Sequence, residues 1–236
     1  MRKTQSEKKE PFAELSRYDI TAGILAGGKS SRMGENKSFL PWRGTTILRH
    51  ELAQLKFFSQ ILISVAERQE YLELEEQGIV LVEDSRKAYG PLEGIYQLLK
   101  HAKHEWVFVL ATDMPLVERN LIEQMLTLDR QGVQAVVLQE GERIQPLCGL
   151  YHVSILPVLE ELFQEEVHSM YQLLNHISVR YIPLEELQLT ERILTNVNTP
   201  EEYGKLLEKE AAKDGKETGI EENRKEKRGE ERCVLQ

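Results

Sequence analysis

The sequence has few cysteines and no long apolar run, and both absences limit what the protein can be. Among its 236 residues only Cys148 and Cys233 are cysteines, which gives no basis for a disulfide framework or a zinc site. We expect Cys148, in an apolar stretch, to be a small buried hydrophobic side chain. No apolar run approaches the ~20 residues that span a bilayer, and residues 1–14 lack the apolar core of a signal peptide. We therefore expect a soluble, cytoplasmic protein without membrane contacts.

Positive charge is also scarce over most of the chain. The formal net charge is −9, and residues 20–204 alone carry 16 basic and 26 acidic side chains. A surface of this sign repels nucleic-acid backbones, so we expect no nucleic-acid partner. Residues 29–43 are the exception, because they hold four cations and one acid. The cations are Lys29, Arg32, Lys37 and Arg43. This loop has the charge to hold one polyphosphate.

The residues before that loop form a short apolar run that stops abruptly. Residues 20–26 are mostly apolar and end at Gly27-Gly28, which predicts a buried strand that runs into a glycine turn. Adjacent glycines allow positive φ and let a ligand approach the main chain, so successive N–H groups can point at an anion. The pattern predicts a phosphate-binding site at the carboxyl end of the first strand, where open α/β sheets bind ligands.

A P-loop is a competing interpretation of the same residues. Gly23, Gly28, Lys29 and Ser30 satisfy the pattern G-x-x-x-x-G-K-[ST]. A P-loop begins after its strand ends, whereas the residues from Gly23 to the glycine turn have the composition of a strand interior. We therefore favour the glycine turn and keep a P-loop NTPase as an alternative, for which residues 106–113 could form the Walker B strand.

Strand patterns alternate with helical patterns along residues 20–204. Predicted strands cover residues 20–26, 61–65, 79–82, 106–111, 135–138 and 144–151. Predicted helices cover residues 45–58, 67–77, 116–130 and 153–163, with others beginning at Pro91 and near Ser169. The alternation predicts an α/β fold of three layers, Rossmann-like, with a mainly parallel sheet. The turn around Gly141 makes the last two strands a short antiparallel addition, and the most apolar strand, 106–111, should be central.

The two ends of the chain lack such patterns. Residues 1–19 have no sustained periodicity, and we expect them to form a flexible leader. Residues 205–236 carry nine basic and nine acidic side chains without aromatic residues, which predicts a short helix that frays into a disordered tail. Residues 20–204 then form the folded domain.

Two acidic residues follow predicted strands. Asp84 comes after residues 79–82, and Asp113 comes after the central strand. Because parallel strands present their carboxyl ends at one edge, both acids are expected beside the glycine turn. Mg²⁺ prefers hard oxygen ligands, few of them from protein and the rest from phosphates and water, so Asp113 is the predicted ligand of Mg²⁺ or Mn²⁺. The alternatives are a helix cap for Asp113 and a surface turn or cap for Asp84.

The segment Gly90-Pro91-Leu92-Glu93-Gly94 marks the start of a helix. Proline suits a first helical position, whereas glycine within a helix costs about 1 kcal/mol relative to alanine. The glycine at position 94 therefore predicts that another part of the chain packs closely against the helix start.

Four ordered segments resemble the molybdenum cofactor guanylyltransferase family, nucleotidyltransferases with a glycosyltransferase-A-like fold. The segments are Leu25-Ala26-Gly27-Gly28-x-Ser30-x-Arg32-Met33-Gly34-x-x-Lys37, Gly90-Pro91-Leu92-x-Gly94, Asp113-Met114-Pro115 and Asn196-x-Asn198-Thr199-Pro200. The resemblance implies transfer of GMP from GTP to molybdenum-bound molybdopterin, with release of pyrophosphate. It also implies transient contact with proteins that deliver the cofactor or mature molybdoenzymes. The acceptor phosphate is already a nucleophile, so catalysis would consist of positioning and charge neutralisation.

The resemblance also implies roles for individual residues. Nucleotide-binding residues would be Leu25, Ala26, Gly27, Gly28, Lys37, Asp84 and Asp113. Catalytic residues would be Arg32, Lys37, which neutralises charge as pyrophosphate leaves, and Asp113, which holds the metal. Acceptor-binding residues would be Pro91, Leu92, Gln145, Pro146, Asn196 and Asn198. The chain departs from the family at Ser64, where the family can place an asparagine that contacts the nucleotide.

Two more functions stay open beside that of a P-loop NTPase. One is a related transferase that uses CTP on the same cofactor or a sugar or erythritol phosphate as acceptor; the Ala-Gly-Gly form of the loop favours guanine by resemblance. The second is a non-catalytic protein that binds GTP but releases no pyrophosphate.

Overall fold

The computed structural model describes residues 20–27, 33–75, 77–86 and 89–212. The chain up to Thr195 forms one compact unit, and the chain from Asn196 forms a second. In the described ranges no helix is both long enough and apolar enough to cross a membrane. The predicted leader and residues 213–236 of the predicted tail lie outside these ranges.

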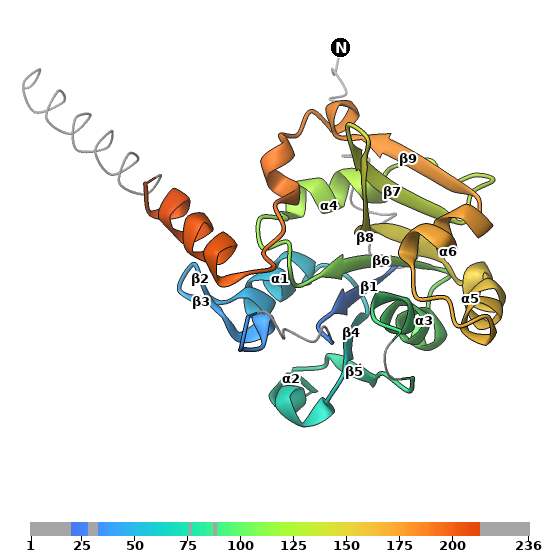
Figure 1. The fold of residues 1–236 in the computed structure, drawn as a ribbon, viewed down its shortest axis with the longest axis horizontal. Coiled ribbons are helices and arrows are strands. Elements are labelled where there is room, and N and C mark those ends of the chain that lie inside the picture. The colour runs from blue at the N-terminus through green and yellow to red at the C-terminus, as the bar shows by residue number, and fades with distance from the viewer. Residues whose placement is uncertain (1–19, 28–32, 76, 87–88, 213–236) are drawn as a thin grey trace, which may run out of the picture. The chain divides into compact units, whose positions relative to one another are not determined.

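A seven-stranded sheet forms the centre of the first unit, with strands in the order β5-β4-β1-β6-β8-β7-β9 (Figure 1). The strands are β1 Ile20–Leu25, β4 Ile61–Val65, β5 Val80–Glu83, β6 Trp106–Ala111, β7 Ala135–Glu140, β8 Arg143–His152 and β9 Val179–Pro183. β5, β4, β1 and β6 run parallel, whereas β8 is antiparallel to β6 and β7. β6 is the fourth of these seven strands, so its predicted central position is confirmed.

Helices cover both faces of the sheet (Figure 1). They are α1 Ile47–Leu55, α2 Leu72–Glu75, α3 Pro91–His101, α4 Arg119–Leu126, α5 Leu156–Gln164 and α6 Met170–His176. Side chains of α1 and α4 share one apolar core, and those of α3, α5 and α6 share another. Within β6, Phe108 belongs to the first core and its neighbours Val107 and Val109 to the second, because strand side chains alternate between faces. The predicted three-layer α/β fold is confirmed.

Several elements differ from the sequence prediction. The predicted helix 67–77 is a 3₁₀ turn, Arg68–Tyr71, followed by the single turn α2. Residues 45–46 are not helical, because they form β3 Thr45–Thr46, which pairs with β2 Pro41–Trp42. β9 was not predicted, and it lies parallel to β7 at the sheet edge opposite β5.

The second unit contains a helix over residues 200–212. Thr199 and Glu202 cap the start of this helix. The Glu202 N–H donates to Oγ1 of Thr199 at 3.2 Å, and the Glu202 carboxylate accepts from the N–H groups of Thr199 and Asn198 at 3.1 and 2.6 Å. These reciprocal bonds satisfy N–H groups that a helix start leaves without an intrahelical acceptor.

Candidate functional site

The register of the sheet brings the predicted nucleotide-binding segments to one edge. Leu25, the last residue of β1, lies opposite Ser64 of β4 and Ala111 of β6. Since these strands are parallel, the glycine turn and Asp113 both follow at the same edge. Ser64 in turn lies opposite Val82 of β5, two residues before Asp84.

The antiparallel strand β8 adds a further segment to that edge. Its Cys148 lies opposite Leu110 near the end of β6, so the start of β8, with Gln145 and Pro146, lies beyond the carboxyl end of β6. Gln145 is 4% exposed, and among the described residues its buried Nε2 has no hydrogen-bond partner. Gln145 and Pro146, the two predicted acceptor residues of this strand, therefore lie at the same edge of the sheet as Asp113.

The main chain at the end of β1 is held from both neighbouring strands. The Ala26 N–H donates to the Ser64 carbonyl at 2.9 Å, and the carbonyl of Leu25 accepts from the Thr112 N–H at 3.3 Å. Gly23 lies inside β1, and a Cβ there would lie 2.7 Å from Cδ1 of Leu98. The first residues of the P-loop pattern are therefore strand, and the glycine at its start allows α3 to pack, which disfavours the P-loop interpretation.

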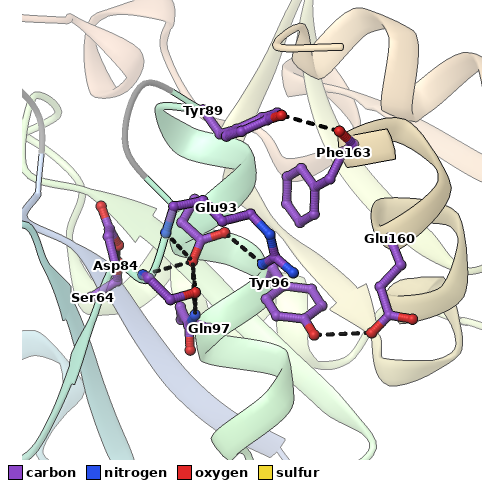
Figure 2. A network of polar contacts seen from close by, with 10 residues as sticks. Ser64, Asp84, Tyr89, Glu93, Tyr96, Gln97, Glu160 and Phe163 are labelled. Atoms are coloured by element: carbon purple, nitrogen blue, oxygen red, sulfur yellow. Dashed lines mark hydrogen bonds and ion pairs between the residues drawn. The ribbon is translucent and has the colours of Figure 1, made fainter. Parts of the chain in front are cut away.

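Gly27 and Asp84 lie against each other at this edge. A Cβ on Gly27 would lie 3.0 Å from the main-chain N of Ala66 and 3.2 Å from Oδ2 of Asp84. The Ser64 hydroxyl donates to the other carboxylate oxygen, Oδ1, at 2.8 Å (Figure 2). Only glycine fits at position 27 without displacing main chain. Ser64, where the chain departs from the resembled family, thus holds the carboxylate of Asp84 in place.

Burial raises the pKa of Asp84 to about 6. The hydrogen bond from Ser64 opposes that shift, and the negative charges of Glu93 and Glu83 reinforce it. A carboxyl group in a confined site with acidic neighbours holds its proton more tightly. Asp84 therefore changes charge just below neutral pH.

Gly94 of α3 packs against the same group of residues. A Cβ there would lie 2.6 Å from Cδ2 of Leu25 and 2.9 Å from Oγ of Ser64. The close packing predicted from the glycine in the first turn is confirmed. It lets α3 approach the ends of β1 and β4.

Glu93 organises the loop that follows Asp84, and its role was not predicted from the sequence (Figure 2). The side chain is fully buried, and Oε1 accepts from the Ser85 N–H and hydroxyl at 2.9 and 2.8 Å, and from Gln97 Nε2 at 2.7 Å. Arg86 contributes its N–H to Oε1 at 3.3 Å and its guanidinium to Oε2 at 3.1 Å. Burial alone would raise the pKa of Glu93, but these donors together lower it.

The same network connects α3 with α5 (Figure 2). The Arg86 guanidinium lies 4.8 and 4.5 Å from the ring centres of Tyr96 and Phe163, a cation–π arrangement. The Tyr96 hydroxyl donates to Glu160 at 2.9 Å, and the Tyr89 hydroxyl donates to the Phe163 carbonyl at 3.0 Å. Arg86 and Tyr89, which follow β5, are thus held by residues of two helices.

Asp113 is half-buried at the end of β6, and it is not a helix cap. The next helix, α4, begins six residues later with Glu118 at its N-cap position, so the capping interpretation is wrong. Asp113 lies near Glu51 of α1 and Cys148 of β8, since its negative charge adds to the effect of burial in raising the pKa of both groups. Cys148 is fully buried, as predicted.

Glu51 is a second buried carboxyl group that was not predicted from the sequence. It is fully buried, and among the described residues neither oxygen has a hydrogen-bond partner. Burial raises its pKa well above the usual range, and Asp113 raises it further. Its spacing could have revealed it, because residues 47, 48, 51, 52 and 55 form one helix face, and the other four are apolar.

Lys37 begins a 3₁₀ turn, Lys37–Phe39, whose N-cap is Asn36. The Asn36 side chain accepts from the Ser38 N–H at 3.1 Å, so the predicted catalytic lysine lies on a capped turn. Gly28 and Arg32 lie outside the described residues.

The remaining predicted acceptor residues have different surroundings. Pro91 is exposed at the start of α3, whereas Leu92 is fully buried, so Leu92 could influence an acceptor only through packing. Asn196 and Asn198 belong to the second unit.

Comparison with known proteins decides the family. The model of the MobA-like NTP transferase domain matches residues 22–180. The chain belongs to this family. It is a nucleotidyltransferase, and the strand edge with Gly27, Asp84 and Asp113 is the candidate active site of a MobA-like domain.

Relatives and solved structures agree with this assignment. The chain is 35% identical over 192 residues to "Probable molybdenum cofactor guanylyltransferase" of Carboxydothermus hydrogenoformans, covering 80% of this chain and 95% of the relative. The fold is similar to that of molybdopterin-guanine dinucleotide biosynthesis protein A from Archaeoglobus fulgidus, with a TM-score of 0.69, 22% identity, and coverage of 78% of this chain and 95% of that one.

The fold is also found in a synthase with a different name. The 4-diphosphocytidyl-2C-methyl-D-erythritol synthase of Anaerococcus prevotii matches with a TM-score of 0.60 and 15% identity, covering 82% of this chain and 95% of that one. The fold alone therefore does not identify the substrate. The choice of nucleotide base has to be argued from side chains.

Proposed function

We propose that this nucleotidyltransferase transfers GMP from GTP to molybdenum-bound molybdopterin and releases pyrophosphate. The observation that carries the proposal is the Asp84 carboxylate beside Gly27, with one oxygen held by Ser64 and the other beside the turn. An ionised carboxylate only accepts hydrogen bonds. Guanine offers two adjacent donors, N1–H and the exocyclic N2–H₂, whereas cytosine offers one donor beside two acceptors. Asp84 therefore favours guanine over cytosine.

The chemistry requires positioning rather than a general base. An oxygen of the acceptor phosphate attacks the α-phosphorus of GTP, a new P–O bond forms, and the bond to the β-phosphate oxygen breaks. The electron pair leaves with pyrophosphate, so negative charge increases on the leaving group. Lys37, on its capped turn at the end of the glycine loop, would neutralise that charge, and a fixed cation acts most strongly where charge develops.

A divalent metal fits the residues at this edge. Asp113 supplies one hard carboxylate oxygen at the end of the central strand, and among the described residues no group of three or more histidine, cysteine or acidic side chains could hold a metal. Mg²⁺ commonly takes one or two carboxylates together with substrate phosphates and water. We propose that Asp113 holds Mg²⁺ or Mn²⁺ in this way. The ion would neutralise phosphate charge.

The acceptor is proposed to bind on the β8 side of the edge. The buried Nε2 of Gln145, which has no partner among the described residues, is a donor suited to an acceptor oxygen. A buried donor without a partner costs roughly 1–3 kcal/mol, so binding an acceptor there would recover that loss.

The test is a nucleotide panel in which GTP, CTP, ATP and UTP are supplied with molybdenum-loaded molybdopterin and Mg²⁺. Pyrophosphate release should be fastest with GTP, by about 100-fold or more over CTP, because an unmatched hydrogen-bonding edge is rejected strongly. Asp84→Asn should reduce this preference, since a carboxamide both donates and accepts. Equal turnover with CTP would remove the guanine assignment, and binding of GTP without turnover would favour a non-catalytic protein.

Two lysine variants distinguish the glycine-turn interpretation from the P-loop interpretation by their activity in solution. Lys37→Ala should lose most of the pyrophosphate release, whereas Lys29→Ala should retain it. The reverse result would restore the P-loop interpretation, in which the lysine of the G-K-[ST] motif is essential.

A further inference from the structure

Tyr71 contacts the chain on both sides of residues 28–32, which lie outside the described ranges. It ends the 3₁₀ turn Arg68–Tyr71 and is 2% exposed. Its hydroxyl oxygen is 3.1 Å from the Ala26 carbonyl oxygen, 2.8 Å from Nδ2 of Asn36 and 3.2 Å from Oγ of Ser38. One buried hydroxyl therefore contacts the residue before the glycine turn and both neighbours of Lys37.

The direction of each bond follows from the available protons. A tyrosine hydroxyl has one proton to donate and two lone pairs that accept. The Ala26 carbonyl can only accept, so the Tyr71 proton points to it. The Asn36 amide can only donate through Nδ2, and the Ser38 hydroxyl then donates as well. All three positions of the hydroxyl are used, so no side chain without a hydroxyl can replace it.

The partners of Tyr71 are themselves fixed. Ser38 is fully buried, and Asn36 also donates to the Glu70 carboxylate at 2.7 Å while it caps the turn of Lys37. Ala26 is tied to β4 through its own N–H. The Tyr71 hydroxyl thus sets the distance between the glycine turn and the backbone of Lys37.

We propose that Tyr71 is a positioning residue for the nucleotidyl transfer, which acts by holding Lys37 in register with the glycine turn. This inference rests on the proposed function, because it assigns Lys37 to the leaving pyrophosphate.

The ring of Tyr71 also packs on Phe39, with ring centres 5.1 Å apart. Phenylalanine keeps that packing and removes only the hydroxyl, so Tyr71→Phe isolates the proposed role.

The first test compares Tyr71→Phe with Tyr96→Phe, which removes a buried tyrosine hydroxyl that bonds to Glu160 instead. In pyrophosphate release with GTP and acceptor, Tyr71→Phe should lower kcat by about 10- to 100-fold, because a small displacement of a catalytic group has effects of this size. KM for GTP should change less than about threefold, since Lys37 acts as pyrophosphate leaves. Tyr96→Phe should match the wild type. Equal kcat values for both variants would overturn the proposal.

A double variant tests whether Tyr71 acts through the lysine. If it does, Lys37→Ala combined with Tyr71→Phe should be within about twofold of Lys37→Ala alone, because the second change removes nothing further. Asn36→Ala removes the amide that donates to the Tyr71 hydroxyl. It should reproduce the kcat loss of Tyr71→Phe. Losses that multiply in the double variant would show that Tyr71 acts independently of Lys37.

A ligand-free measurement separates this inference from the proposed function. Amide hydrogen exchange of Tyr71→Phe should be faster in peptides that contain Ala26 and residues 36–40, and unchanged in β6 and β8. If the wild type turns over no nucleotide but exchange rises as expected, the proposed function fails and the positioning stands. Unchanged exchange together with unchanged kcat would reject the positioning.

Discussion

Glu93 and Glu51 are buried glutamates on opposite faces of one sheet, and their surroundings differ completely. Glu93, on α3, accepts hydrogen bonds from Ser85, Arg86 and Gln97, whereas Glu51, on α1, has no hydrogen-bond partner among the described residues. Burial alone would raise both pKa values, but that of Glu93 is lowered by its donors and that of Glu51 is raised well above the usual range. Burial sets the cost of a charge, and the donors around it decide whether the charge remains.

The difference has a structural consequence at the candidate active site. Glu93 remains a charged acceptor and uses its bonds to hold the residues immediately after Asp84. Glu51 lies on the Asp113 side and holds nothing in place through hydrogen bonds to the described residues. We therefore expect the two glutamates to respond to substitution in opposite directions.

The largest effect is expected for Glu93→Ala. It leaves the Ser85, Arg86 and Gln97 donors without their shared acceptor. Since each buried donor left unsatisfied costs about 1–3 kcal/mol, the summed loss in the free energy of unfolding should exceed that of any other variant considered. Urea denaturation at pH 7 measures the change. Glu93→Gln keeps an acceptor at Oε1 but not the ion pair, so it should lose about 1–3 kcal/mol. A wild-type midpoint for Glu93→Ala would mean that the network contributes nothing.

Replacement of Glu51 should have the opposite sign. Glu51→Met fills a similar volume and removes a buried polar group without hydrogen bonds, which should stabilise the protein by about 1–2 kcal/mol in the same urea experiment. Glu51→Gln is the matched control, since its amide is equally polar, and no gain is expected. If Glu51→Met were as destabilising as Glu93→Ala, the contrast between the two faces would be wrong.

Asp84 adds a pH dependence to the Glu93 side. Its folded-state pKa of about 6 lies above the usual carboxyl range, so stability is greatest when Asp84 is protonated and is lost as pH rises through 6. The advantage in Tm of Asp84→Asn over wild type should therefore be larger at pH 8 than at pH 5. Affinity for GTP should change the other way, falling about tenfold from pH 7 to pH 5 as the carboxylate is protonated. An affinity independent of pH would contradict the role of Asp84.

The smallest effect is expected at the outer part of the Glu93 network. Tyr96→Phe removes one hydrogen bond to Glu160 and keeps the ring that packs against Arg86. The loss should be about 0.5–1 kcal/mol, measurable as a small shift of the urea midpoint. A loss as large as that of Glu93→Ala would place the centre of the network at Tyr96 instead.

Much of the fold could be predicted from the sequence, because hydrophobic period and turn chemistry are local properties. β4 and β6 have the predicted bounds, and the antiparallel pair β7 and β8 follows from the glycine turn between them. β9 was missed, since Val179–Pro183 is short and only one of its residues is buried. The helix predicted over residues 67–77 was too long. This segment is mostly polar and charged, so its few apolar residues do not define a helix of that length.

The candidate site was predictable only in part. Asp84 and Asp113 were found because they follow strands, and the sheet register brings both to one edge. Tyr71, Glu93 and Glu51 were missed, since what each one does depends on residues distant in the chain. Tyr71 contacts Ala26 from 45 positions away, and such pairings cannot be derived from local patterns.

The main chain at the end of β1 has little freedom to move, since Leu25 and Ala26 bond to Thr112, Ser64 and Tyr71. Any change of nucleotide preference therefore has to come from side chains around a constant framework. Under the proposed function, a substitution at position 64 or 84 should alter the preferred base while the main chain of Leu25 and Ala26 stays in place. The hydrogen bonds that fix the end of β1 would then serve any base, and only the surrounding side chains would need to change.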